Sequence, residues 1–92
     1  MLRVLVLYPQ APDPERYAAH AELCRKVPGG EFSHGPVFAT PFGEPVYAYL
    51  AEWRFPDRAA FDAATRTPEF AATGRDGAAM GLPFSVHFAE SA

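Results

Sequence analysis

His20 is the side chain in this 92-residue sequence that is best suited to chemistry. It shares one face of a predicted helix with Tyr17, Ala21, Cys24 and Val27, because these residues recur at intervals of three and four. Histidine titrates near neutral pH, so an imidazole on an otherwise apolar face suits a general acid or base beside a cavity. The alternative interpretation is a structural histidine that is hydrogen-bonded to a backbone carbonyl.

Aromatic side chains are the candidate ligand contacts. They are Tyr8, Tyr17, Tyr47, Tyr49 and Trp53. Each combines a broad apolar surface with one polar tip, which suits a flat, apolar, oxygenated ligand. Alternating aromatic residues are also typical of a buried strand, so packing in a core or an interface is the competing interpretation for each of them.

Metal ligands and nucleophiles are not evident in the sequence. His20, His34 and His87 fall on different predicted elements and lack the short spacing of metal ligands, so we expect no metal site. The serines lack the flanking glycines of a nucleophile elbow. The one cysteine, Cys24, falls on the inward helix face and is expected to be a small apolar filler. The sequence implies no cofactor.

The first strand and the first helix have clear boundaries. Residues 2–8 form an apolar stretch that ends at Pro9, which predicts a strand. A helix is expected to follow, because Asp13 can cap it and Pro14 suits its first position. The Pro-Gly-Gly run at 28–30 ends this helix.

The rest of the chain completes a βαββαβ order. Residues 31–40 predict an edge strand that Gly35-Pro36 interrupts, and residues 46–55 predict a strand with alternating aromatics. A second helix is expected over residues 57–66, with a short broken continuation over 68–73. Residues 83–89 predict a last strand. Right-handed crossovers then place the helices on one face of a four-stranded antiparallel sheet, so we predict a ferredoxin-like α+β fold in which residues 1–92 form a single domain.

The face of the sheet that the helices leave uncovered predicts a dimer. Leu5 and Leu7 make the first strand apolar on both sides, and the third strand has aromatics on one side and Leu50 on the other. An aromatic patch of this size rarely stays in water, so we expect a homodimer packed sheet against sheet, with a ligand cavity between the subunits. Glu52 and Arg54 are expected to form an ordinary surface pair at the end of the third strand.

Composition excludes several classes of partner. The net charge is −3 and the basic residues are scattered, so nucleic acid is not expected as a partner. No apolar run approaches the ~18 residues of a membrane span, so we expect no membrane association. A lone cysteine suits a reducing cytoplasm, which is the predicted location.

Five short motifs occur in order along nearly the whole chain. They are Val-Leu-Tyr-Pro at 6–9, Tyr-Ala-Ala-His at 17–20, Arg-Lys-Val-Pro-Gly at 25–29, Ala-Ala-Phe at 59–61 and Thr-Pro-Glu at 67–69. Together they resemble the EthD-like family of dimeric α+β-barrel proteins. The resemblance implies a small cytoplasmic homodimer, often found alongside degradative or oxygenase systems, in which His20 corresponds to a histidine on the first helix of the family.

The absence of asparagine disfavours other proteins of similar topology. Haem-degrading barrels use an Asn, His and Trp set, and acylphosphatase-like folds use an Arg with an Asn. RNA-recognition modules share the βαββαβ order, but their glycine-and-basic strand signature is missing and the charge here is negative.

Two functions are left open by the sequence. The first is an enzyme, or an accessory of one, that acts on a small apolar oxygenated compound, with His20 as acid or base and the aromatic residues as positioning groups. The second is a non-catalytic dimer that binds a ligand or a partner, with His20 in a structural role.

Overall fold

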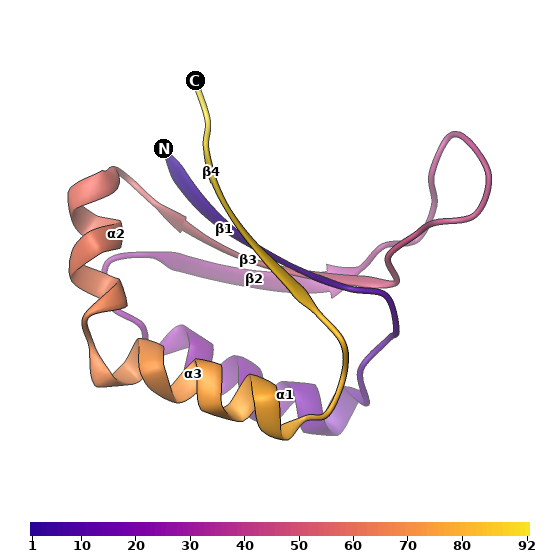
Figure 1. Cartoon of the computed structure of the whole chain (residues 1–92), viewed down its shortest axis with the longest axis horizontal. Coiled ribbons are helices and arrows are strands. Elements are labelled where there is room, and N and C mark those ends of the chain that lie inside the picture. Colours follow the sequence, from indigo (N-terminus) through magenta and orange to yellow (C-terminus); the bar gives the residue numbers. More distant parts are fainter.

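The computed structural model describes residues 1–92 and contains one four-stranded antiparallel sheet with helices on one side (Figure 1). The strands are β1 (Leu2–Tyr8), β2 (Glu31–Pro36), β3 (Tyr49–Phe55) and β4 (Ser85–Glu90), in the order β2-β3-β1-β4. The helices are α1 (Pro14–Arg25), α2 (Arg58–Thr65) and α3 (Pro68–Ala79). This arrangement confirms the predicted ferredoxin-like α+β fold, with α1 and α3 packed side by side under the sheet.

Each helix begins where the sequence places a capping side chain. Asp13, Asp57 and Thr67 have extended backbones, and each accepts a hydrogen bond from the backbone N–H three residues later. Pro14 and Pro68 occupy first helical positions, where no N–H is needed. The predicted start of every helix is therefore confirmed.

The third helix is longer than predicted. The sequence indicated a break after Thr73 because Gly74 and Gly77 are poor helix formers. In the structure α3 continues to Ala79, packs along α1, and carries Asp76 to within hydrogen-bond distance of α1 side chains. Tertiary contacts outweigh the local propensity here.

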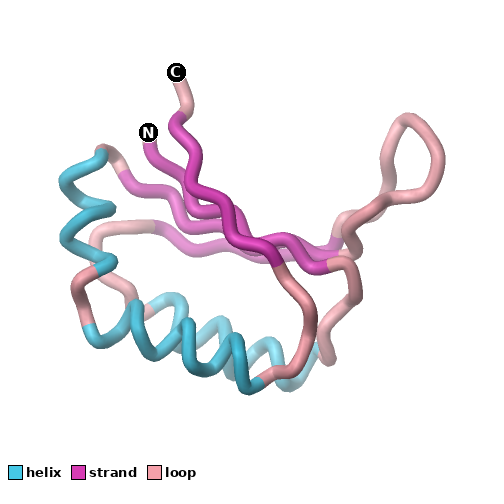
Figure 2. Tube along the Cα trace, in the orientation of Figure 1, coloured by secondary structure: helices cyan, strands magenta, loops and turns pink.

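The connection between β2 and β3 is also longer than predicted. β2 ends at Pro36 rather than residue 40, and β3 begins at Tyr49 rather than residue 46. Residues 37–48 form a loop that projects beyond the sheet (Figure 2). Prolines at 36, 41 and 45 remove the N–H donors that a longer ladder would need. Phe38, Phe42 and Val46 are exposed on this loop.

The core lies between the sheet and the helices. Val4 of β1 is opposite Trp53 of β3, and Tyr8 is opposite Tyr49, so one face carries the large aromatics. This face is toward the helices, where Val4, Tyr8, Trp53 and Phe55 are buried. The prediction that the aromatic residues of β3 lie on the uncovered face is therefore wrong. The register of β1 and β3 places the aromatic residues of β3 on the face toward the helices.

The uncovered face is part leucine and part ionic. Leu7 of β1 is opposite Leu50 of β3, and neither is fully buried. Two positions along, Glu52 is only 8% exposed, because the side chains of Arg3 and Arg54 cover its carboxylate, at 2.5 Å and 3.7 Å respectively. Glu52 thus pairs with Arg54 as predicted, but its carboxylate is buried rather than on the surface, and its shorter ion pair is with Arg3. No helix has the length and apolar run that a bilayer span requires.

The close approach of β2 to the core gives the first prediction. A Cβ at Gly30 would lie 2.6 Å from Cε1 of Phe55, a fully buried ring that has no room to retreat. We expect Gly30→Ala to lower the free energy of unfolding by about 1–3 kcal/mol through overpacking. The matched control is Gly35→Ala, since a Cβ there meets nothing within 4 Å. Urea unfolding of both variants checks this, and equal stabilities would contradict the packing described for Phe55.

Candidate functional site

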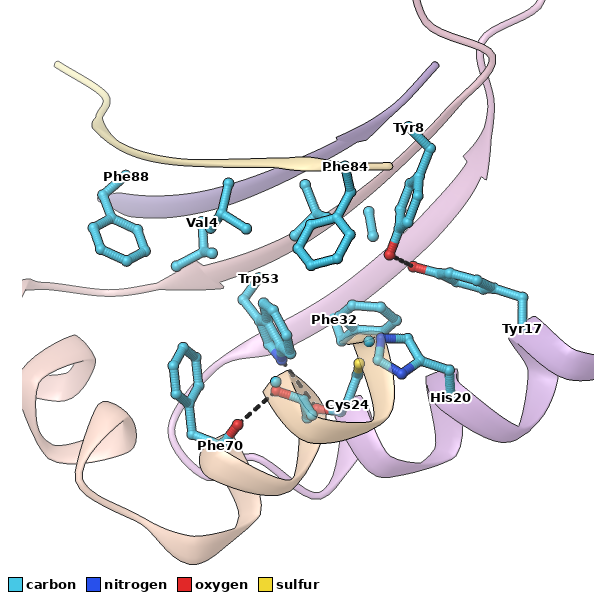
Figure 3. A pocket seen from close by; sticks show the side chains of 16 residues that line it. Val4, Tyr8, Tyr17, His20, Cys24, Phe32, Trp53, Phe70, Phe84 and Phe88 are labelled. Carbon is cyan, nitrogen blue, oxygen red and sulfur yellow. Dashed lines mark hydrogen bonds between the residues drawn. The ribbon is translucent and has the colours of Figure 1, made fainter. Parts of the chain in front are cut away.

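An apolar cavity lies inside one chain, between the sheet and the pair α1 and α3 (Figure 3). Its volume is about 180 Å³, and 12 of its 16 lining residues are hydrophobic. Strand residues supply one wall: Val4, Val6, Ala51, Trp53, Val86 and Phe88. The helices supply the other: Tyr17, His20 and Cys24 from α1, and Phe70, Thr73, Gly74 and Gly77 from α3. This cavity lies within one chain. The cavity between two subunits that the sequence indicated stays a prediction.

His20 is the lining residue of this pocket that is best suited to acid–base chemistry. It is only 5% exposed and projects from α1 into the cavity, as Figure 3 shows. Its Nδ1 lies 2.8 Å from Oδ2 of Asp76, a residue of α3. The partner is a carboxylate rather than the backbone carbonyl that a purely structural histidine was expected to have.

Asp76 is held as an anion by Arg16. The guanidinium of Arg16 donates two hydrogen bonds to the carboxylate, at 3.0 Å to Oδ2 and 2.8 Å to Oδ1. These bonds from Arg16, together with the weaker contribution of the His20 bond, hold the pKa of Asp76 below its ordinary value of 3.8 against the opposing effect of burial. At neutral pH the carboxylate is therefore an acceptor only.

The ionised carboxylate of Asp76 determines which tautomer the neutral His20 ring adopts. An ionised carboxylate requires that Nδ1 carry the proton and donate it, so the neutral imidazole keeps its lone pair on Nε2. No other group of the chain bonds to Nε2. Since every fully buried polar side-chain atom has a partner, the unbonded Nε2 must be accessible, and His20 lines the cavity. His20 thus presents a proton acceptor to an apolar space.

Tyr8 and Tyr17 close one end of the pocket. Their hydroxyl oxygens are 3.2 Å apart, and their rings meet edge to face with centroids 5.6 Å apart. Burial raises the pKa of both phenols, so both stay neutral and one donates its hydrogen to the other. The Tyr17 ring also lies against His20, with centroids 5.3 Å apart. Both tyrosines therefore line the pocket, and their role as ligand contacts stays a prediction.

Trp53 and Cys24 form the middle of the pocket. The indole Nε1–H donates to the carbonyl oxygen of Cys24 at 3.0 Å, which fixes the ring across the cavity wall. Burial raises the pKa of the Cys24 thiol to about 12, so the thiolate needed for nucleophilic chemistry does not form at neutral pH. Cys24 packs as an apolar side chain, which is the role the sequence indicated.

Tyr47 and Tyr49 do not line the cavity. The hydroxyl of Tyr49 lies 2.6 Å from Nδ1 of His34, and its ring packs against Tyr17, with centroids 5.1 Å apart. Tyr49 therefore supports the closed end of the pocket from behind. Tyr47 is half-buried in the loop that precedes β3, because the strand begins three residues later than predicted.

The two other histidines are separate from His20. His34 is beside Arg25 and Tyr49, and burial, with a smaller effect of the Arg25 charge, lowers its pKa. His87 is exposed and lies 3.0 Å from the hydroxyl of Ser85. No group of three or more His, Cys, Asp or Glu side chains is placed to hold a metal ion.

Asp76 and Arg16 are functional candidates that sequence reasoning missed. Asp76 fell in a glycine-flanked stretch that was not expected to be helical, so it was not placed near His20. A signal was present on the first helix, because Arg16 and His20 are four residues apart and share a face. A cation and an imidazole so placed favour a common carboxylate partner.

The chain superposes on an EthD family protein from Bacillus halodurans with a TM-score of 0.82 and 26% sequence identity, over 100% of this chain and 99% of that one. The chain has the EthD-like fold. This agrees with the family resemblance indicated by the sequence motifs.

Two further solved structures superpose on this chain at lower identity. One, from a Jannaschia species, is described as a dimeric ferredoxin-like protein of unknown function, with TM-score 0.74 and 24% identity over 98% of both chains. The other is SnoaB from Streptomyces nogalater, described as a cofactor-independent oxygenase, with TM-score 0.62 and 17% identity over 98% of this chain and 90% of that one. No protein-family profile matches the chain, and no curated protein sequence matches it significantly.

The ion pair between Asp76 and Arg16 predicts that the stability of the protein depends on pH. Because the folded pKa of Asp76 is depressed, its stabilising effect is present above the unfolded pKa and is lost as the pH falls through the folded value. We expect the parent to lose more stability than Asp76→Asn between about pH 5 and pH 2. Chemical unfolding at a series of pH values measures this difference.

The control for this experiment is Asp62→Asn. Asp62 is an exposed carboxylate on α2 that forms no ion pair, so its variant should follow the parent at every pH. A constant stability difference between the parent and Asp76→Asn across the acid range would contradict the depressed pKa of Asp76.

Proposed function

We propose that the protein binds a small, largely apolar, oxygenated organic compound in this pocket and that His20 removes a proton from the compound's hydroxyl group. The observation that supports this most directly is the open Nε2 of a histidine whose Nδ1 is held by Asp76 at 2.8 Å. A buried general base needs both features: an accessible lone pair, and a partner that stabilises the cation once the proton arrives.

The volume and lining of the cavity support the proposed ligand class. A dry apolar cavity of roughly 150 Å³ accepts benzene, so about 180 Å³ suits a larger aromatic compound, from a substituted ring to a compact two-ring phenol. The walls are hydrophobic, and the hydroxyls of Tyr8, Tyr17 and Thr73 are already bonded within the chain. A ligand here gains from apolar burial and meets one open acceptor, His20.

The proposed step is a balanced proton transfer. The O–H bond of the ligand breaks, its electron pair stays on oxygen, and a new N–H bond forms at Nε2 of His20. The resulting imidazolium keeps its Nδ1–H bonded to the Asp76 carboxylate, which offsets the charge. Before the proton arrives, the Asp76 carboxylate is already paired with the guanidinium of Arg16, so its negative charge is compensated.

The setting of this step is proposed from the solved relatives. SnoaB is described as a cofactor-independent oxygenase, and proton removal from a hydroxyl makes an organic compound more electron-rich and more readily oxidised. We therefore place the protein alongside degradative or oxygenase-type metabolism, in the cytoplasm, where its free Cys24 stays reduced. The non-catalytic alternative has the same pocket with no ionisation of the ligand.

The proton acceptor can be tested with 4-nitrophenol, whose neutral and ionised forms absorb at different wavelengths. Trp53, the single tryptophan, lines the pocket and reports binding by fluorescence. We expect His20→Leu to weaken 4-nitrophenol binding by about 10- to 100-fold, the equivalent of one hydrogen bond to a charged group, and to leave the bound probe neutral.

Two controls separate loss of the base from loss of the pocket. 4-Nitroanisole has no hydroxyl proton, so the parent and His20→Leu should bind it equally. His87→Leu changes an exposed histidine on the other side of the sheet and should behave as the parent. Equal affinity of the parent and His20→Leu for 4-nitrophenol, with no ionised form bound, would favour the non-catalytic alternative.

We also propose that the protein acts as a homodimer. Its uncovered sheet face carries Leu5, Leu7 and Leu50, and the projecting loop carries Phe38 and Phe42, which are 93% and 87% exposed. Exposed apolar groups of this kind mark an interaction surface. The Jannaschia relative is described as dimeric, which supports a second copy as the partner.

The dimer is tested by placing a charge on the leucine face. Sedimentation equilibrium of the parent should give twice the chain mass, and Leu7→Glu should raise the dissociation constant at least about tenfold. The control is Ala18→Glu, which adds the same charge at an exposed position on α1. A parent that stays monomeric at every concentration would exclude the proposed dimer.

A further inference from the structure

Two glycines in the interior of α3 line the cavity: Gly74 and Gly77. Glycine is the least favourable residue after proline inside a helix, because its unfolded chain has more conformations to lose. Neither residue has a positive φ, since Gly29, Gly43 and Gly81 are the glycines with that conformation. The backbone therefore does not demand glycine at either position.

Packing within the chain does not demand glycine there either. A Cβ at Gly74 would meet nothing within 4 Å, and one at Gly77 would lie 3.8 Å from Cε1 of His20 and 3.9 Å from Cζ of Phe84. These are ordinary van der Waals distances. At Gly30, by contrast, the same construction gives 2.6 Å to Phe55 and glycine is obligatory.

The position of Gly77 relates it to the base. A methyl group there would project between His20 and Phe84, which both line the pocket. His20 is only 5% exposed and lines the pocket, and its unbonded Nε2 is the ring neighbour of Cε1, the atom that a Cβ at Gly77 would approach. A ligand whose hydroxyl reaches Nε2 would therefore lie near the bare backbone of α3 at Gly77, and the exposed Gly74 is one turn earlier.

We infer that Gly74 and Gly77 determine ligand size, because the space of their missing side chains is occupied by a ring of the ligand. This rests on the proposed function, and it names two specificity-determining residues that form no polar contact. A methyl group fills roughly 30 Å³, about the share of one water molecule, and so takes roughly a sixth of the cavity. Larger ligands should be excluded first.

The test compares a larger probe, the two-ring 2-naphthol, with the smaller phenol, using Trp53 fluorescence. Gly77→Ala should weaken 2-naphthol binding by about 5- to 100-fold through overpacking, and phenol binding by less than about twofold. The same variant should raise the melting temperature by about 2–8 °C, because alanine favours the helix. Gly74→Ala should shift both quantities in the same directions, by less for binding.

The matched control is Ala71→Gly, at an exposed position of the same helix away from the cavity. It should lower the melting temperature and leave both affinities unchanged. Unchanged 2-naphthol affinity in Gly77→Ala would overturn the size-determining role, as would a fall in its melting temperature, which would show that packing requires glycine.

The outcomes also separate this inference from the proposed function. If the parent binds both phenols and His20→Leu loses that binding while Gly77→Ala does not, the glycine role fails alone. If the parent binds neither phenol, the proposed function and the inference fail together.

Discussion

Asp76 accepts hydrogen bonds from Arg16 and His20, and through them it ties α3 to α1 beside the cavity. The position of α3 matters because this helix supplies the wall that faces the sheet. The orientation of the His20 ring matters because it decides which nitrogen meets a ligand. Both depend on one carboxylate, which is held as an anion by a guanidinium.

The aromatic residues take their places from strand register. Leu2, Val4, Val6 and Tyr8 alternate toward the helices, and the antiparallel pairing brings Trp53 and Phe55 to the same side. The helix layer therefore covers a surface of large rings that do not close completely, and the remaining space is the pocket. Leucines and the Arg3–Glu52 pair are left on the opposite face, so the proposed ligand site and the proposed dimer surface lie on opposite sides of one sheet.

The fold could be predicted from the sequence because its signals are local. Asp13, Asp57 and Thr67 mark helix starts by side-chain chemistry that acts within three residues. The end of α3 could not be predicted, since its glycines oppose the helix and only contacts with α1 extend it to Ala79. Which face of β3 is buried was also not local information. Both sides of that strand are partly apolar, and pairing with β1 decides between them.

Some residues of the candidate site could likewise be predicted from the sequence, and others could not. His20, Tyr8, Tyr17 and Trp53 could be selected from residue type and spacing, and the structure brings them to one pocket. Tyr47 could not be separated from them, because its place in a loop depends on where pairing of the strand begins. Asp76 could not be found, because it is 56 positions from His20 and meets it only through helix packing.

The central claim is that His20 presents an unprotonated Nε2 to the pocket, and the ring nitrogens can be observed directly. Two-dimensional ¹H–¹⁵N correlation spectra of the imidazoles, assigned by loss of one signal in His20→Leu, distinguish the two neutral tautomers. The account predicts that neutral His20 carries its proton on Nδ1, and that this proton moves to Nε2 in Asp76→Asn or is shared between both nitrogens. A neutral His20 that is protonated on Nε2 in the parent protein would contradict it.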